Sequence, residues 1–189
     1  MKTLYFITSN KGKLHEAQTE LEALGYDVIQ KNIGYPEIQA DHLEDVARFG
    51  VDHVHQQVDH PFILEDAGLF IDALEGFPGV YSSYVYFTIG LDGILRLLKR
   101  MDTTKRTATF KSVFAYGDPS GTMELFIGSC NGRITTEKKG THGFGYDPIF
   151  IPDDENMTFA EMDTKKKNSF SHRGKSLEKL KIFLTKNGK

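Results

Sequence analysis

The sequence predicts a mixed α/β fold built as one continuous domain over residues 1–189. Three patterns predict it: a strand–helix–strand opening over residues 3–30, a β-rich middle over 106–137, and an amphipathic helix over 171–185. No internal repeat, low-complexity tract or proline-rich linker interrupts the chain, so we expect a single domain.

The opening segment predicts a parallel strand–helix–strand unit. Residues 3–8 are apolar and β-prone, as a buried strand requires, and residues 26–30 repeat that pattern. Between them, apolar residues recur at helical spacing, at Leu14, Ala17, Leu21 and Leu24. Because Gly25 ends this pattern, we expect a helix over 12–24.

A second helix and a buried strand follow. Residues 42–56 carry an apolar face made of Leu43, Val46, Ala47, Gly50 and Val54. The apolar run 62–64 predicts a strand that ends at Glu65 and Asp66. These two acidic residues are therefore expected where a buried strand reaches the edge of the sheet.

The rest of the chain predicts a turn, a short helix, a hairpin and a final helix. Residues 76–79 contain the Gly and Pro of a turn, and residues 92–100 have the apolar spacing of a short helix. Residues 106–116 and 122–137 are β-rich, and the turn sequence between them predicts a long antiparallel hairpin. The helix over 171–185 follows from three leucines in phase, Leu177, Leu180 and Leu184.

Composition and charge exclude several classes of protein. Residues 165–189 hold nine Lys or Arg and one acid, whereas the other 164 residues hold 14 basic and 25 acidic residues. A basic nucleic-acid binder would not show this balance, so we expect no nucleic-acid partner. No apolar run approaches the length of a bilayer span, so we expect no membrane partner. The single cysteine, Cys130, can form no internal disulfide, and we expect a cytoplasmic protein.

The loop from Thr8 to Lys13 is the first candidate binding site. It joins a strand to the start of a helix, where unpaired N–H groups and the helix dipole favour anions. Gly12 allows close approach of the backbone, and two lysines add positive charge. The loop lacks the G-x-x-x-x-G-K-[ST] pattern of a P-loop. Ordinary capping of the helix by Ser9 or Asn10 is the alternative interpretation.

Acidic residues form the second candidate site. In open α/β sheets, ligands bind beyond the carboxyl ends of strands, and carboxylates there suit Mg²⁺. Glu65 and Asp66 hold that position, and Glu37 lies in the loop before the second helix. The alternative is that Asp66 caps a turn while the two glutamates are solvated.

Two later segments could recognise a base and phosphates. Residues 143–148 place one aromatic between glycines and another before an acid, which offers a ring for stacking. The alternative is that the aromatics fill the core.

In residues 167–173, Ser171 is a credible helix cap, which puts His172 and Arg173 in the first turn. Cations there oppose the helix dipole unless an anion is bound nearby, and a solvated basic turn is the alternative.

Together these segments resemble the inosine/xanthosine triphosphate pyrophosphatase family, whose members remove non-standard purine nucleotides. The matching segments occur in family order: Thr8 to Lys13, Pro36 and Glu37, Glu65 to Leu69, Pro78 to Tyr81, Gly143 to Pro148, Phe159 to Met162, and Lys167 to Arg173. The resemblance implies a long bent mixed β-sheet flanked by helices, with two lobes, the nucleotide cleft between them, and a homodimer. It also implies Mg²⁺-dependent hydrolysis of ITP, dITP and XTP to the monophosphate and pyrophosphate.

The resemblance further implies roles for individual residues. Asp66 would activate the attacking water and, with Glu37, hold the Mg²⁺. The implied substrate-binding residues are Thr8, Ser9, Asn10, Lys11, Gly12, Lys13, Ala67, Phe144, Gly145, Tyr146, Asp147, Lys167, His172 and Arg173. Phe144 would stack on the base. Ala67 stands where many members have Ser or Thr, so a hydroxyl contact is lost there.

Two alternatives remain open. A Maf-like nucleotide pyrophosphatase would have a related fold and act on other modified nucleotides, but the sequence at 171–173 argues against it. A non-catalytic nucleotide-binding module would use the same loops for sensing. Such a module needs no carboxylate that activates water, so Glu37, Glu65 and Asp66 argue against it.

Overall fold

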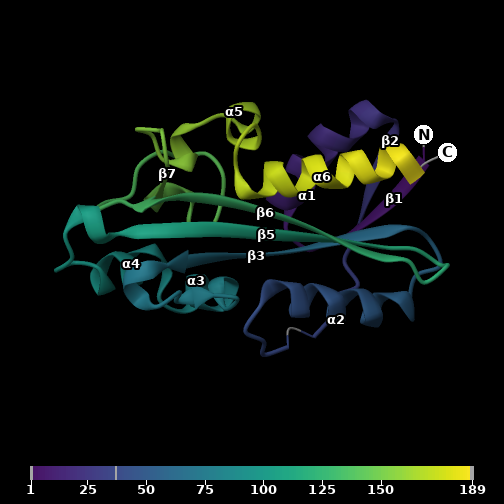
Figure 1. Ribbon diagram of the computed structural model, residues 1–189, viewed down its shortest axis with the longest axis horizontal. Helices are drawn as coiled ribbons and strands as arrows, with labels where there is room; N and C mark the ends of the chain where they lie inside the picture. The colour runs from purple at the N-terminus through teal and green to yellow at the C-terminus, as the bar shows by residue number, and fades with distance from the viewer. Residues whose placement is uncertain (1, 37, 188–189) are drawn as a thin grey trace. The chain divides into compact units, whose positions relative to one another are not determined.

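The computed structural model describes residues 2–36 and 38–187 (Figure 1). The helices are α1 (Lys11–Leu21), α2 (Leu43–His55), α3 (Ser82–Thr88), α4 (Gly90–Leu97), α5 (Thr164–Asn168) and α6 (His172–Asn187). The strands are β1 (Lys2–Ile7), β2 (Tyr26–Lys31), β3 (Phe62–Ile71), β4 (Pro78–Gly79), β5 (Thr107–Gly117), β6 (Met123–Ile134) and β7 (Phe150–Pro152). Short 3₁₀ turns join several of these elements.

The described strands form a seven-stranded mixed sheet. Its order is β2-β1-β3-β5-β6-β7, and β4 pairs with β3. β1 runs parallel to both of its neighbours, with Phe6 opposite Gln30 of β2 and Ile63 of β3. β4 and β7 run antiparallel to β3 and β6. The predicted mixed α/β class, with a sheet flanked by helices, is therefore confirmed.

The chain divides into two compact units. The first unit comprises Met1–Asp66, Ser112–Gly128 and Lys175–Lys189, and the second comprises Ala67–Lys111 and Ser129–Gly174. Three strands, β3, β5 and β6, contribute part of their length to each unit. Whether the chain acts as a single domain, with a nucleotide cleft between two lobes, stays a prediction.

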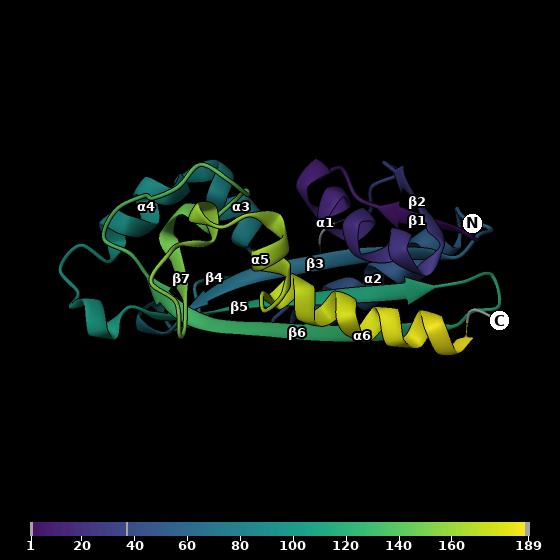
Figure 2. The same ribbon diagram turned by 90° about the horizontal axis from the view of Figure 1, so that it is seen from above.

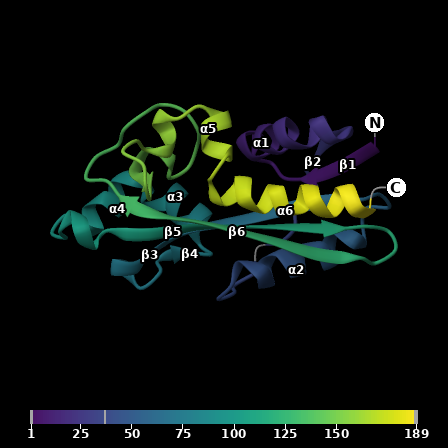
Figure 3. The ribbon, with the colours of Figure 1, turned by 45° about the horizontal axis from the view of Figure 1, so that its top comes forward.

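In the first unit, α1 and α6 cover one face of the strands and α2 covers the other (Figures 1 and 3). The core beneath α1 and α6 includes Leu4, Phe6, Ala17, Leu21, Val28, Ile63, Phe114, Leu177 and Leu180. Side chains alternate along β3, because Ile63 joins this core while the Phe62 ring contacts His55 of α2 at 5.2 Å between centroids.

The second unit packs α3, α4 and β7 around an aromatic core (Figure 2). Phe150 contacts the rings of Phe110 and Phe159, with centroids 4.7 and 5.1 Å apart. Arg106 is buried and donates to the carbonyl oxygens of Leu98 at 2.8 Å and Thr135 at 2.7 Å. This side chain ties the end of α4 to the end of β6 through uncharged acceptors.

Most predicted elements are confirmed. The opening strand–helix–strand unit is parallel, and Gly25, in a left-handed conformation with φ 78°, ends the helical segment. β5 and β6 are neighbours in the sheet joined by a short turn, as a hairpin requires. The final helix begins at His172. No helix in the described part of the chain has the length and apolar character of a membrane span.

Two elements differ from the predictions. β3 does not end at Glu65 and Asp66 but continues to Ile71, so the prediction of strand-end carboxylates is wrong. Its parallel neighbour β1 stops opposite Leu64, and β3 goes on to pair with β4 instead. The sequence also gives no sign of α3, because its Tyr, Val, Phe and Thr residues favour strands.

Candidate active site

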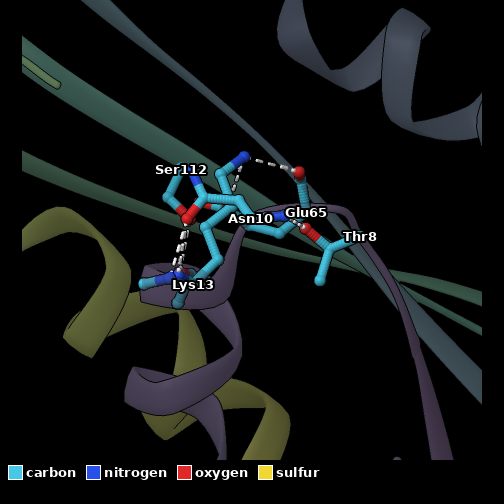
Figure 4. A network of polar contacts seen from close by, with 7 residues as sticks. Thr8, Asn10, Lys13, Glu65 and Ser112 are labelled. Atoms are coloured by element: carbon cyan, nitrogen blue, oxygen red, sulfur yellow. Dashed lines mark hydrogen bonds and ion pairs between the residues drawn. The ribbon is translucent and has the colours of Figure 1, made fainter. Parts of the chain in front are cut away.

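The loop after β1 is organised around Asn10 (Figure 4). The Asn10 side-chain oxygen accepts hydrogen bonds from the backbone N–H of Gly12 at 2.9 Å and of Lys13 at 3.1 Å, which caps α1. The Asn10 N–H donates to the Thr8 hydroxyl oxygen at 3.1 Å. Capping by Asn10 is therefore confirmed, and it engages two of the amides that could otherwise face an anion. Ser9 and Lys11 are exposed.

Lys13 is held by Glu65 of β3 (Figure 4). Its ammonium nitrogen lies 2.6 Å from Glu65 Oε2 and donates to the Glu65 backbone carbonyl at 3.0 Å. The Glu65 side chain is fully buried, and 19% of the Lys13 side chain is exposed. The alternative interpretation that Glu65 is solvated is therefore wrong. A buried carboxylate requires such a partner, because an unpaired charge is costly away from water.

The other oxygen of the Glu65 carboxylate meets two serines. Ser112 of β5 donates to Glu65 Oε1 at 2.7 Å, and the hydroxyl oxygens of Ser112 and Ser176 of α6 are 2.9 Å apart. Both serines are completely buried. No local sequence signal identifies this contact, because the three residues come from distant parts of the chain.

Asp66 follows Glu65 in β3 and is half-buried. Both carboxylate oxygens of Glu65 face Lys13 and Ser112. Asp66, the predicted metal ligand, is the more exposed of the two acidic residues. Ala67 comes next and is also half-buried. Glu37, the other predicted metal ligand, lies outside the described residues.

The acidic residues of β3 suit a Mg²⁺ site better than a site made of protein ligands alone. Within residues 2–36 and 38–187, no group of three or more His, Cys, Asp or Glu residues is placed to hold a metal ion. Mg²⁺ does not need such a cage, because it commonly binds one or two carboxylates, substrate phosphates and several waters. A single aspartate such as Asp66 fits that pattern, whereas it would not make a structural zinc site.

A buried ion pair organises the candidate base-binding residues of the second unit. Lys167 lies 2.7 Å from Asp147 Oδ2, and their side chains are 2% and 4% exposed. The same oxygen accepts a hydrogen bond from the Phe144 N–H at 2.8 Å. Gly143 has φ 71°, and a Cβ there would collide with the Asp147 carboxylate. Glycine at this position therefore lets the loop fold over Asp147.

Phe144 is half-buried and contacts two cationic groups. Its ring centroid is 4.9 Å from Lys167 Nζ and 5.1 Å from Arg173 Cζ. Such contacts are cation–π interactions, which hold the ring in a defined orientation. Gly145, next to the ring, is half-buried with φ 60°.

The first turn of α6 is buried. His172 stacks on Phe110 with centroids 4.5 Å apart and ring planes 7° apart, and His172 and Arg173 are each 2% exposed. Ser171 caps the helix, because its hydroxyl oxygen accepts from the Gly174 N–H at 3.0 Å. The alternative of a solvated basic turn is therefore wrong.

Tyr146 is part of the core of the second unit. It lies in the second core, and its hydroxyl donates to the Ser82 carbonyl at 2.8 Å. Burial raises the pKa of this phenol, with a smaller contribution from Tyr86. A substrate contact by Tyr146 would therefore come from its backbone.

Comparisons with known proteins agree over nearly the whole chain. The Ham1 family matches residues 4–183. A dITP/XTP pyrophosphatase from Thermococcus kodakarensis is 53% identical over 184 residues, which cover 97% of this chain and 98% of that protein. Another dITP/XTP pyrophosphatase, from Methanopyrus kandleri, is 48% identical over 179 residues, covering 95% and 94%.

Solved structures give the same result for the fold. A HAM1 protein from Coxiella burnetii superposes with a TM-score of 0.84 at 32% identity and covers 98% of this chain and 100% of its own. A nucleoside-triphosphatase / dITP/XTP pyrophosphatase from Mycobacterium abscessus superposes with a TM-score of 0.71 at 30% identity, covering 94% and 97%.

Proposed function

Because this chain belongs to the Ham1 family, we propose that it hydrolyses non-standard purine nucleoside triphosphates, dITP, ITP and XTP, to the monophosphate and pyrophosphate. The observation that carries this proposal is the similarity to dITP/XTP pyrophosphatases over nearly the full length of both chains. The enzyme would remove faulty nucleotides from the nucleotide pool. The buried pairing of Lys13 with Glu65, directly before Asp66, supports it independently.

Lys13 and the loop from Thr8 to Gly12 are proposed to bind the triphosphate. An ammonium group has three N–H donors, and within the described part of the chain Lys13 donates one to the Glu65 carbonyl and forms an ion pair with Glu65 Oε2. The remaining donor can bond to a phosphate oxygen. Ser9 and Lys11, which are exposed at the same loop, would add contacts to the leaving pyrophosphate.

Asp66 is proposed to orient and deprotonate a water molecule for attack at the α-phosphorus. The new P–O bond forms as the bond to the bridging oxygen breaks, and pyrophosphate leaves. Asp66 and Glu37 would also hold Mg²⁺, which when bound offsets phosphate charge and polarises the phosphoryl oxygens. Ala67 offers no hydroxyl, so its contact would be through the backbone.

The base is proposed to meet the residues around Phe144. The half-buried ring offers a face for stacking, and the Asp147–Lys167 pair fixes the loop that carries it. Hypoxanthine and xanthine differ from adenine in their 6-oxo group, which accepts hydrogen bonds. Donors for that group would come from His172, Arg173 or the backbone near Gly145.

One assay tests this proposal against its rivals. The protein is incubated with dITP, XTP, ITP, ATP and GTP, with and without Mg²⁺, and the products are identified. We expect pyrophosphate and monophosphate from the first three, and much less from ATP and GTP. Release of orthophosphate would contradict the proposed cleavage, in which water attacks the α-phosphorus and pyrophosphate leaves. Turnover only of other modified nucleotides would favour a Maf-like enzyme, and binding without turnover would favour a sensing module.

We also propose that the protein is a cytoplasmic homodimer. A surface for self-association is supported by α3, which exposes 68% of Tyr84 and 81% of Phe87. Large aromatic side chains are enriched at protein interfaces. The single cysteine, Cys130, is consistent with a reducing compartment.

A further inference from the structure

Ser112 is a polar residue in an otherwise apolar row. Along one face of β5, the buried side chains are Ala108, Phe110, Ser112 and Phe114. Ser176 similarly lies beside the buried leucines of α6. A hydroxyl buried among apolar side chains destabilises the fold unless it is hydrogen-bonded, so packing alone would favour alanine at both positions.

The hydrogen bonds of these serines have a defined direction. The Glu65 carboxylate, paired with Lys13, can only accept hydrogen bonds. Ser112 must therefore donate its single proton to Glu65 Oε1 at 2.7 Å. Because that proton is used, a hydrogen bond between the two hydroxyls, which lie 2.9 Å apart, takes its proton from Ser176. The contacts form a chain that runs from α6 through β5 to β3.

This chain fixes a side chain that would otherwise move. Lysine has a long, flexible stem and loses rotamer entropy when it is held in one place. Glu65 accepts a hydrogen bond from Ser112 at Oε1 and forms an ion pair with Lys13 at Oε2, so its carboxylate cannot rotate without breaking one of these contacts. The Lys13 ammonium is consequently held in a single position before any ligand arrives.

We propose that Ser112 and Ser176 are positioning residues for phosphate chemistry, which act through Glu65 to aim the Lys13 ammonium at the departing pyrophosphate. This inference rests on the function proposed above. A donor that is already oriented stabilises charge as it develops, without reorganisation during the reaction. The paired Glu65 reduces the ground-state attraction for the substrate. The serines should therefore affect kcat more than KM.

The test compares Ser112→Ala, Ser176→Ala and the double variant by steady-state hydrolysis of dITP with Mg²⁺. Each single variant should lower kcat about three- to tenfold, the effect of one hydrogen bond, with KM within about twofold of wild type. Because Ser176 acts through Ser112, the double variant should be no slower than Ser112→Ala. Ser176→Thr keeps the hydroxyl and should recover most of the rate.

Thr185→Ala is the matched control. It removes an exposed hydroxyl of α6 that bonds to the Lys181 carbonyl at 2.8 Å, and kcat should not change. Thermal unfolding of each variant separates lost positioning from lost structure. If Ser112→Ala does not fold, Ser176→Ala, at the far end of the chain of contacts, decides the question.

Three results would overturn the inference: unchanged kcat in both single variants, effects that multiply in the double variant, or a fall in kcat that only follows the fall in melting temperature. Failure of the proposed function gives a different result. Wild-type protein would then release no pyrophosphate from dITP, and the inference would fall with it.

Discussion

At the scale of single residues, Asp66 and Glu65 are neighbours with different environments. The Glu65 side chain is fully buried, with Ser112 hydrogen-bonded to one carboxylate oxygen and Lys13 ion-paired with the other, whereas Asp66 is half-buried. Glu65 therefore holds Lys13, and Asp66 is the residue proposed above for the reaction.

Asp66→Asn should lower kcat by about 10²- to 10⁴-fold, because the amide cannot take a proton from water. The fold should remain intact, with a melting temperature close to that of wild type. Asp72→Asn, an exposed acid just after β3, is the control and should keep normal kinetics. A normal rate for Asp66→Asn would remove Asp66 from the mechanism.

Asp147→Asn should destabilise the protein by about 3–5 kcal/mol, because it removes the negative charge that lies 2.7 Å from the buried Lys167 ammonium. Urea unfolding measures this loss. Asp92→Asn removes one partner of the exposed pair with Lys138 and should cost less than about 1 kcal/mol. Equal losses in the two variants would contradict the burial argument.

At the scale of elements, α1 depends on a single cap. Asn10→Ala removes the acceptor for the N–H groups of Gly12 and Lys13 and should destabilise the protein by about 0.5–2 kcal/mol. KM for dITP should rise, because the loop from Thr8 to Lys13, which is proposed to bind the phosphates, loses its shape. Asn10→Asp retains an acceptor oxygen and should keep most of the stability; an equal loss would show that the cap does not matter.

The β5–β6 hairpin carries a titrating tyrosine near its turn. Burial, with a smaller contribution from Asp118, raises the pKa of Tyr116 to about 12, above the value of about 10 expected when unfolded. A raised phenol pKa contributes stability that is fully present below pH 10 and is lost as the pH rises towards 12. The free energy of unfolding, measured with denaturant from pH 9 to 12, should fall more steeply with pH for wild type than for Tyr116→Phe. Parallel curves would contradict this prediction.

How much could be predicted from sequence depended on the range of the interactions. The βαβ opening, the hairpin and the Ser171 cap are local patterns, and all three are confirmed. α3 could not be predicted, because packing overrides the strand preference of its residues. The contact of Lys13 with Glu65 joins residues 52 positions apart, and no spacing rule reveals it.

At the scale of the whole molecule, one sheet contributes strands to both units, but the buried core is divided in two. Each unit has its own core, one lined by the leucines of α6 and the other by phenylalanines. α3 belongs to the second unit and leaves two aromatic side chains largely exposed. This surface is the candidate for contact with a second copy of the chain.

Phe87→Glu should convert the proposed homodimer into a monomer, because it places a charge in an apolar interface. Light scattering measures the mass directly. Ile182→Glu, which changes an exposed apolar residue of α6, is the control and should leave the mass unchanged. A monomeric wild type would refute the dimer.

The pairing of Lys13 with Glu65 has a consequence for how a nucleotide arrives. Two opposite charges 2.6 Å apart act at a distance as a dipole, whose field fades faster than that of a lone cation. Lys13 therefore does little to steer a triphosphate through solution, and diffusional encounter at this loop should depend only weakly on ionic strength through it. In the proposed reaction, Lys13 would act only after the phosphates had bound.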